Sequence, residues 1–327
     1  MRVHTTACRY GLLVAFAQAL RAPAPGASVR LGARRSAPRV GARRVALGAY
    51  AAPAPELALP GDTLETLPGH VAAAGGCAAL TLACVARDAA LLPAGAAAAA
   101  LAFGLFAAEL FSGVFHWATD NYGSLETPVF GPACAAFQGH HGAPWTITYR
   151  STANNVHKIA RAVIPLVCLS QLLPPFLALA ASVMFFGQVC AQEAHKWSHV
   201  PPSEQPGAVR FLQTRGLALS VREHGLHHSN PYGAHYCILF GALNPWLDKS
   251  NVFRRLERFF YERTGVEPNC WKDGPRGAAL RDIALGRLEV ARVEGAAPPV
   301  AVFDDVAEAA GDAAAAPRRA AALARSR

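Results

Sequence analysis

The sequence is poor in charged residues, and the charges it has are unevenly placed. Only 16% of its 327 residues are Asp, Glu, Lys or Arg, whereas soluble domains carry about a quarter. Nine of the 31 Lys and Arg residues precede the first acidic residue, Glu56, which leaves 22 basic and 22 acidic residues in the remainder. The body of the chain is therefore neutral, and the composition favours a membrane protein over one that binds nucleic acid.

Several common motifs are also absent. The eight cysteines include no CxxC pair, so a disulfide framework is not indicated. The zinc metalloprotease motif HExxH is missing, because His195 is followed by Lys196. Neither a Rossmann glycine fingerprint nor a cytochrome b5 haem motif occurs. Any electrons that the protein uses must therefore come from a separate donor.

The acid-free N-terminus has the features of targeting sequences. Residues 10–20 form an apolar run after two arginines, too short to span a bilayer but typical of a signal-peptide core. Residues 21–55 are rich in Arg, Ala, Pro and Gly, as transit peptides are. We therefore expect a signal-like segment (1–20), a transit-like segment (21–55) and a plastid membrane location reached by the two-part targeting of several algal groups. A plain secretory signal with a basic tail is the alternative.

Three apolar blocks follow a linker (56–70) and predict membrane helices. Residues 71–85 and 89–115 approach or exceed the roughly 20 residues that cross a hydrocarbon core. The third block, 159–191, is interrupted by Pro174 and Pro175, which predicts two helices joined by a turn. The predicted fold is all-α: an integral membrane helical bundle (71–273) of about four transmembrane helices, followed by a disordered Ala/Arg-rich tail (274–327). The short apolar run 236–247 is expected to lie at the interface or to re-enter the membrane.

Ten of the twelve histidines lie between His116 and His235, and eight of them form four groups together with one aspartate. The groups are His116–Asp120, Gln138–His141, His195–His199 and His224–His228. Side chains three and four residues apart share a helix face, with Cβ atoms about 5–6 Å apart, so that two of them can hold one metal. Ionisable residues beside membrane spans are costly and mark functional sites.

The number of donors predicts a histidine-ligated di-metal site at one membrane face. Eight histidines and Asp120 exceed the three or four ligands of one zinc site and fit two metals. Imidazole suits iron, zinc and copper, and nitrogen ligands around two irons suggest dioxygen activation. His195 can meet His116 only if the block between them crosses the membrane an even number of times, which favours the hairpin. A metal transporter would instead place its ligands inside the spans.

The sequence segments around the histidines resemble those of the chloroplast fatty acid desaturase 4 family of plants, whose superfamily includes the plasmanylethanolamine desaturases. The matching segments are Ser112–Gly123, Phe137–His141, Pro144–Thr148, Asn154–His157, His195–His199, His224–His228, Asn230–Tyr232 and Tyr236–Ile238. By this resemblance the metal ligands are His116, Asp120, His140, His141, His195, His199, His224, His227 and His228. The roles of His157 and His235 stay open.

The resemblance implies a plastid membrane enzyme with two non-haem irons and O2 as co-substrate. Its expected reaction is a trans desaturation at carbon 3 of palmitate in phosphatidylglycerol, with electrons from an external donor such as ferredoxin. A vinyl-ether-forming desaturase or a lipid hydroxylase with the same di-iron site is the alternative, because ligand spacing does not decide the product.

Other residues have structural interpretations. Glu109, inside an apolar run, either supports the metals or has a packing or snorkelling role. Trp117, Trp145, Trp197 and Trp246 are predicted interfacial anchors. The basic residues Arg254, Arg255 and Arg258 predict an amphipathic helix on anionic lipid, with an ordinary solvated face as the alternative.

Overall fold

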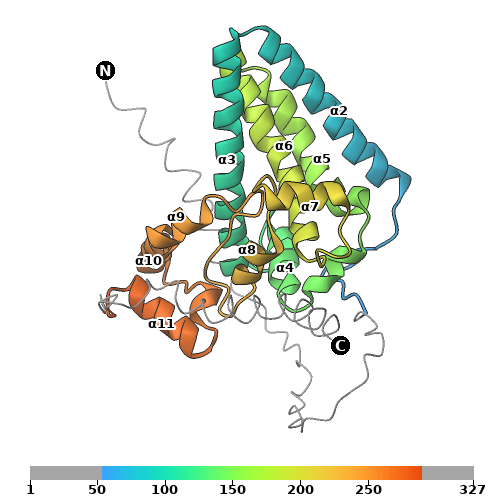
Figure 1. The fold of residues 1–327 in the computed structure, drawn as a ribbon. Helices are drawn as coiled ribbons and strands as arrows, with labels where there is room; N and C mark the ends of the chain where they lie inside the picture. The colour runs from blue at the N-terminus through green and yellow to red at the C-terminus, as the bar shows by residue number, and fades with distance from the viewer. Residues whose placement is uncertain (1–53, 289–327) are drawn as a thin grey trace, which may run out of the picture.

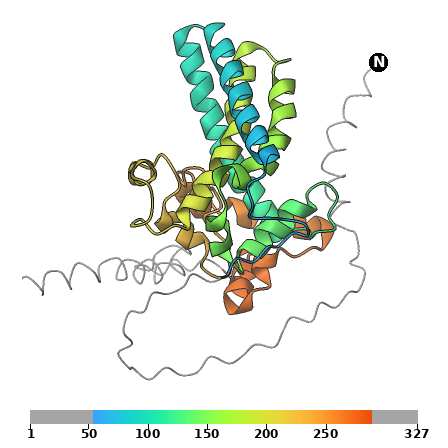
Figure 2. The same cartoon turned by 90° about the vertical axis from the view of Figure 1, so that its right-hand side faces the viewer.

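The computed structural model describes residues 54–288, and within this range it contains helices and no β-strand. Four long helices form a bundle, and the shorter elements gather at one end of it (Figures 1 and 2). The long helices are α2 (Pro68–Ala90), α3 (Ala94–Asn121), α5 (Thr152–Ser170) and α6 (Pro175–Ser198). The shorter elements are α4 (Gly131–His140), η1 (Pro144–Tyr149), α7 (Gly207–Thr214), α8 (Val221–His227), α9 (Asn244–Lys249), α10 (Val252–Thr264), η2 (Asn269–Trp271) and α11 (Gly274–Ala284). The predicted all-α bundle is confirmed.

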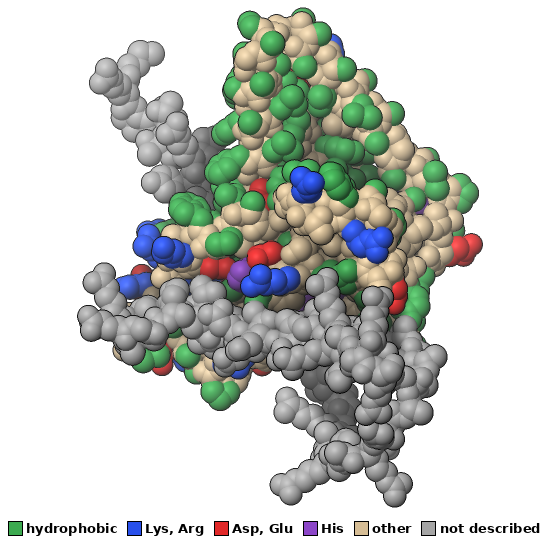
Figure 3. Space-filling view, viewed as in Figure 1, with side chains coloured by type: hydrophobic (Ala, Val, Ile, Leu, Met, Phe, Trp, Pro, Cys, Tyr) green, Lys and Arg blue, Asp and Glu red, His purple; other side chains and the backbone are tan. Residues whose placement is uncertain are grey.

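The bundle has an apolar end and a polar end. Helices α2, α3 and α6 are each long and apolar enough to cross a membrane. Helix α5 packs against α2 and α6 but carries Lys158 and Arg161 in its first half. Hydrophobic side chains dominate the visible face of the long helices, whereas charged side chains gather toward the opposite end (Figure 3). We therefore treat the chain as embedded in a membrane by this bundle, in which three of the about four expected membrane helices have the length and apolarity of a span and α5, packed against α2 and α6, leads up to the proline turn.

The turn predicted at the proline pair is present. Pro174 lies in the turn after α5, and Pro175 is the first residue of α6, where the fixed φ of proline suits a helix start. Gln171 in this turn accepts a hydrogen bond from Arg87 (2.5 Å) and donates one to Ser182 (3.0 Å). The hairpin returns the chain to the polar end, so that α6 ends at the same level as α3.

Helices α3 and α6 approach each other closely at small residues. A Cβ built on Gly187 would lie 2.5 Å from the Cβ of Ala108, and one built on Gly104 would lie 2.7 Å from the carbonyl oxygen of Ala180. Small residues permit such contacts between membrane helices. The contacts fix how α3 and α6, which both carry histidines, are placed relative to each other.

The first part of the apolar segment 236–247 is buried in protein against α3. Tyr236 and Cys237 are fully buried, and the backbone N–H of Ile238 donates to Ser112 Oγ (3.2 Å). The buried carboxylate of Glu109 accepts the backbone N–H of Phe240 (2.9 Å). Glu109 therefore satisfies backbone donors that have no other partner at this depth, which is a packing role. The first part of the segment is therefore packed against a membrane helix, whereas Trp246 in its second part is exposed.

The C-terminal helices correct two interfacial expectations. Arg254 is buried and forms an ion pair with the fully buried Glu257 (2.5 Å), so it does not contact lipid. Glu257 also accepts hydrogen bonds from Trp117 (3.2 Å) and Trp271 (2.7 Å), and Trp117 is buried as well. An amphipathic sequence pattern alone did not reveal that these side chains satisfy one another inside the protein.

Three segment boundaries also differ or fall outside the described range. Helix α2 begins at Pro68, inside the expected linker 56–70. Residues 274–284, expected to be disordered, form α11, which packs against η2 and α10. The signal-like segment 1–20 and nearly all of the transit-like segment 21–55 lie outside the described residues, as does the tail from residue 289.

Candidate metal centre

Helix α3 presents His116 and Asp120 on one face at its polar end. The Nε2 atom of His116 lies 3.2 Å from Asp120 Oδ2. Its Nδ1 atom lies 2.9 Å from the carbonyl oxygen of Tyr236, so Nδ1 carries the proton and donates it. The Nε2 lone pair is therefore directed at the Asp120 side, an arrangement typical of metal-binding histidines.

Helix α4 ends at His140, and the imidazoles of His140 and the next residue, His141, point toward different partners. His140 Nε2 lies 2.9 Å from His199 Nε2, whereas His141 Nε2 lies 3.1 Å from His227 Nε2 and 3.6 Å from Asp120 Oδ2. Gln138 holds α4 against α3 by donating to the carbonyl oxygen of Thr119 (2.9 Å).

Helices α6 and α8 supply the remaining imidazoles. His195 Nε2 lies 3.0 Å from His140 Nε2, and His224 Nε2 lies 2.9 Å from His199 Nε2. Ser220 caps α8 by accepting the backbone N–H of Glu223 (3.1 Å), as short polar residues do at helix starts. His227 Nδ1 donates to the carbonyl oxygen of Ala234 (2.8 Å), which turns its Nε2 toward Asp120 (3.4 Å).

All nine predicted ligand residues fall into two groups that could each hold a metal ion. One group is His140, His195, His199, His224 and His228; the other is His116, Asp120, His141 and His227. Within each group the candidate ligand atoms lie within 4.8 Å of one another. Two nitrogens bound to one metal at about 2.1 Å, with an angle of 90–110°, are about 3.0–3.4 Å apart. The observed N···N distances of 2.9–3.1 Å fit shared metals.

The electrostatics of the groups also suit metal ions. Burial lowers the pKa of His141 to about 4 and that of His199 to about 3, and it lowers the pKa values of His140 and His224. These imidazoles are therefore neutral near pH 7, which is the form that binds metals. Among residues 54–288, both carboxylate oxygens of Asp120 are buried without a hydrogen-bond partner. A cation is the natural partner for such a carboxylate.

Two aromatic side chains, Phe137 and Tyr232, lie beside the groups. The centroid of the half-buried Phe137 ring lies 4.8 Å from the ring centroid of His116 and 6.4 Å from that of His195. One apolar side chain therefore lies beside both groups. On another side, Tyr232 stacks on His141 with ring centroids 4.2 Å apart. Asp120, His141 and Tyr232 line a pocket of about 260 Å³ whose rim includes Lys272 and Asp273.

Sequence reasoning did not identify Phe137 and Tyr232 as part of the site. Phe137 stands four residues before His141, a helical spacing that could have suggested a shared face. Tyr232 belongs to one of the segments that match the family, but the position of its side chain depends on the conformation of a loop. In this loop the φ of Tyr232 is +58°. Asn, Asp or Gly is more usual at such a φ.

The two histidines with open roles lie outside both groups. His157 stacks on His70 with ring centroids 3.7 Å apart. His235 lies 3.0 Å from Glu223 Oε2 and 3.5 Å from Asp248 Oδ2. Neither contributes to the two candidate metal sites.

Comparison with known proteins finds similar lipid desaturases. The chloroplastic fatty acid desaturase 4 of Arabidopsis thaliana is 46% identical over 178 residues, covering 52% of this chain and 53% of that protein. The plasmanylethanolamine desaturase of Myxococcus xanthus is 32% identical over 204 residues, covering 60% of this chain and 72% of that protein. Plasmanylethanolamine desaturase 1 of Mus musculus is 30% identical over 180 residues, covering 51% and 66%. The chain spans about half the length of the first of these relatives.

No solved structure was found to match the chain. The model of the lipid desaturase domain matches residues 105–271. This range begins in α3 and ends at η2, and it includes all nine residues of the two groups. The chain therefore belongs to the lipid desaturase domain family.

Proposed function

We propose that this protein is a membrane lipid desaturase that introduces a trans double bond at carbon 3 of the palmitoyl chain of plastid phosphatidylglycerol. The observation that carries the proposal is the convergence of nine donors in two groups at the polar end of a membrane bundle. Membership in the family supports the reaction type. The similarity to a chloroplastic fatty acid desaturase supports the lipid substrate and the plastid membrane.

The proposed cofactor is a pair of non-haem irons bound by these nine residues, with O2 as co-substrate. Bound iron would supply the oxidising power, so that O2, two electrons and two protons remove two hydrogens from adjacent methylenes and yield an alkene and two waters. We propose that the electrons come from a plastid donor such as ferredoxin. The expected N-terminal targeting sequence (1–55) would direct the protein to the plastid in an alga with two-part targeting.

The chain's own residues would orient the ligands and separate the substrate from water. The carbonyl oxygens of Tyr236 and Ala234 fix the rings of His116 and His227, so that these ligands cannot turn away when substrate binds. Phe137 contacts an imidazole of each group, and an acyl chain that passes over Phe137 would reach both metals. Apolar contacts there would exclude water from the reacting carbons.

A second candidate shares the same centre. The similarity to plasmanylethanolamine desaturases favours a vinyl-ether-forming enzyme as the runner-up, since only the position of the lipid relative to the metals would differ. A lipid hydroxylase is a further outcome of the same chemistry.

The test is expression of the full chain in a host that makes phosphatidylglycerol, followed by fatty acid profiling of each lipid class. We expect a new trans-3 hexadecenoate confined to phosphatidylglycerol and about two irons per chain. Asp120→Ala should abolish the product, whereas Asp282→Ala, which changes a carboxylate on α11, should not. A vinyl ether or a hydroxylated chain would replace the first choice by one of its rivals, and purified protein without iron would refute the cofactor.

A further inference from the structure

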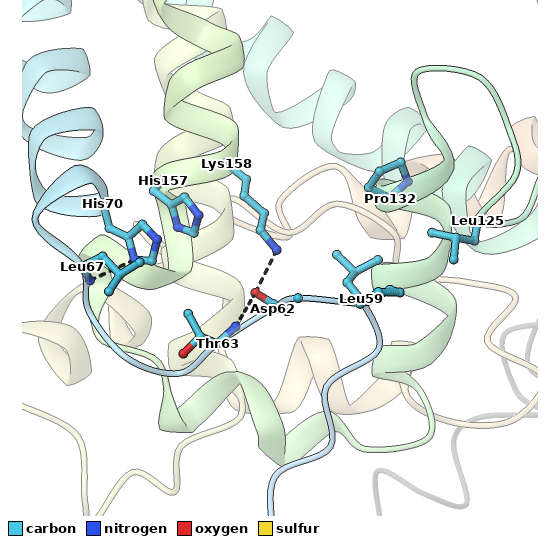
Figure 4. Close-up of a pocket in the computed structure, with 11 residues that line it drawn as sticks. Leu59, Asp62, Thr63, Leu67, His70, Leu125, Pro132, His157 and Lys158 are labelled. Atoms are coloured by element: carbon cyan, nitrogen blue, oxygen red, sulfur yellow. Dashed lines mark hydrogen bonds and ion pairs between the residues drawn. The ribbon is translucent and has the colours of Figure 1, made fainter.

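A second pocket, of about 380 Å³, lies away from the two metal groups (Figure 4). Its walls come from residues 59–63 of the N-terminal segment, the start of α2, the first half of α5 and the region around the start of α4. Leu125 and Pro132 make one side apolar, and the opposite side carries His70, His157 and Lys158 (Figure 4). The pocket is therefore amphipathic.

The two histidines on the polar side offer one donor and one acceptor. His70 Nδ1 accepts the backbone N–H of Leu67 (3.3 Å), so its proton is on Nε2. His157 Nδ1 lies 2.7 Å from the carbonyl oxygen of Asn154 and must donate to it, which leaves Nε2 as an acceptor. Both residues are more than nine-tenths buried, and in each ring Nδ1 makes the hydrogen bond to the backbone, so Nε2 is the ring nitrogen that a ligand would meet.

The charged residues that line the pocket are Asp62 and Lys158, and Arg150 adds a second cation beside Asp62. Asp62 accepts from Arg150 (2.6 Å) and from Lys158 (3.0 Å). Burial raises the pKa of Asp62, but these two cations more than offset that effect and leave the pKa lowered. One carboxylate thus faces two cations. The half-exposed Lys158 ammonium has further N–H groups that can bind an anion.

The pocket lies at the level where membrane helices emerge from the apolar layer. Helix α2 begins at Pro68 and α3 ends at Asn121, and because the turn that joins them lies at the far end of the bundle, both of these ends point toward its polar end (Figure 1). The exposed side chains of Leu67 and Leu125 lie beside the polar groups of the pocket. Apolar and polar groups are mixed in this way at the head-group level of a bilayer.

We propose that this pocket binds the phosphate-bearing head group of the membrane phospholipid whose acyl chain reaches the metal centre. Lys158 Nζ and His70 Nε2–H would bind the phosphate oxygens, and His157 Nε2 would accept a hydroxyl of the head group. The inference rests on the proposed function and adds the residues that select the lipid class.

Helix α4 connects this pocket to the metal centre and sets the distance between them. Pro132 lines the pocket and His140 belongs to a metal group; eight residues of helix separate them, or about 12 Å. An extended chain advances about 1.2 Å per bond, so about ten bonds cover this length. The phosphorus of a glycerophospholipid is about seven bonds from the third acyl carbon and about thirteen from the ninth. About ten bonds from the phosphorus reach about the sixth acyl carbon, between these two positions, so a head group in this pocket would place the first half of the acyl chain near the metal centre.

The test is lipid retention by the purified full chain in detergent, measured by native mass spectrometry. The added compounds are phosphatidylglycerol, a phosphate-free galactolipid and soluble glycerol phosphate. We expect Lys158→Ala and His70→Ala to retain phosphatidylglycerol about tenfold less well, as loss of a hydrogen bond to a charged group predicts. Lys158→Arg should retain more lipid than Lys158→Ala, and Lys249→Ala on α9 should match the wild type. Thermal unfolding of each variant shows whether it is folded.

Several results would overturn the proposal. One is unchanged retention of phosphatidylglycerol in both alanine variants, and another is retention of the galactolipid equal to that of phosphatidylglycerol. A third is binding of glycerol phosphate as tight as that of the lipid, which would assign the pocket to a soluble phosphate ester. Retention needs neither metal nor turnover, so a wild type that retains phosphatidylglycerol but makes no alkene would refute the proposed function alone. In an active enzyme, Lys158→Ala should raise KM for the lipid and leave kcat near the wild-type value.

Discussion

The contact between Gly187 and Ala108 gives the sharpest test of how the bundle holds the metal centre. A Cβ on Gly187 would lie 2.5 Å from the Cβ of Ala108, whereas carbon atoms prefer about 3.5–4.0 Å. Gly187→Ala must therefore move α3 and α6 apart by about 1 Å, because neither side chain can rotate away. Overpacking of this kind costs about 1–3 kcal/mol.

The same shift would reach the metals. Gly187 precedes His195 by eight residues, and Ala108 precedes His116 by the same number. The rings of these two histidines are 6.0 Å apart and belong to different groups. Metal–ligand distances tolerate only about 0.2 Å, so a displacement of about 1 Å between the helices should weaken metal binding as well as stability.

The assay measures iron per chain by mass spectrometry and the thermal unfolding midpoint in detergent. We expect Gly187→Ala to lose at least half of its iron and to unfold at a lower temperature. Gly75→Ala on α2 is the matched control, because its new Cβ meets no atom within 4 Å, and it should be neutral or slightly stabilising. The double variant Gly187→Ala, Ala108→Gly should recover iron, since the nearest remaining atom of residue 108, its Cα, is 3.7 Å away. Full iron in the single variant would refute the reasoning.

Three further changes test other parts of the structure. Asp120→Ala should lower the metal content from about two to about one per chain, because it removes the only carboxylate of its group; unchanged content would contradict the assignment. Glu257→Gln should cost about 3–5 kcal/mol by leaving its buried arginine partner unpaired, as measured by unfolding, whereas Glu262→Gln at an exposed pair should cost little. In the metal-free protein, His141 and His199 stay neutral while the unfolded chain binds protons below about pH 6.5. Stability should therefore fall as the pH is lowered from about 6.5 toward 4, by at most about 1.4 kcal/mol per pH unit for each histidine; a flat profile of unfolding midpoints would contradict this.

The donor residues of the candidate site were predictable because the spacing within each segment is local. His195 and His199 share a helix face through their spacing alone, and the proline pair before them indicated the hairpin that returns them to His116. What the spacing could not predict is the division of the donors. His224 and His228 belong to one group and His227 to the other, which depends on where α8 lies relative to α3 and α6.

Features that depend on contacts between distant segments were not predictable in the same way. Trp117 and Arg254 have the residue types of interfacial anchors, yet both are buried around Glu257. Nothing within ten residues of Trp117 signals a carboxylate that is 140 residues away in the chain. The pairing of His70 with His157 likewise requires the packing of α2 on α5.

The interleaving of the donors has a consequence for how such a protein can change. The adjacent residues His140 and His141 serve different groups, and α8 serves both, so a displacement of either segment disturbs the two groups together. Substitutions that preserve both groups are therefore expected outside these segments, among the residues that surround the groups. Relatives with different substrates are then expected to share the two groups of donor residues and to differ in the residues around them.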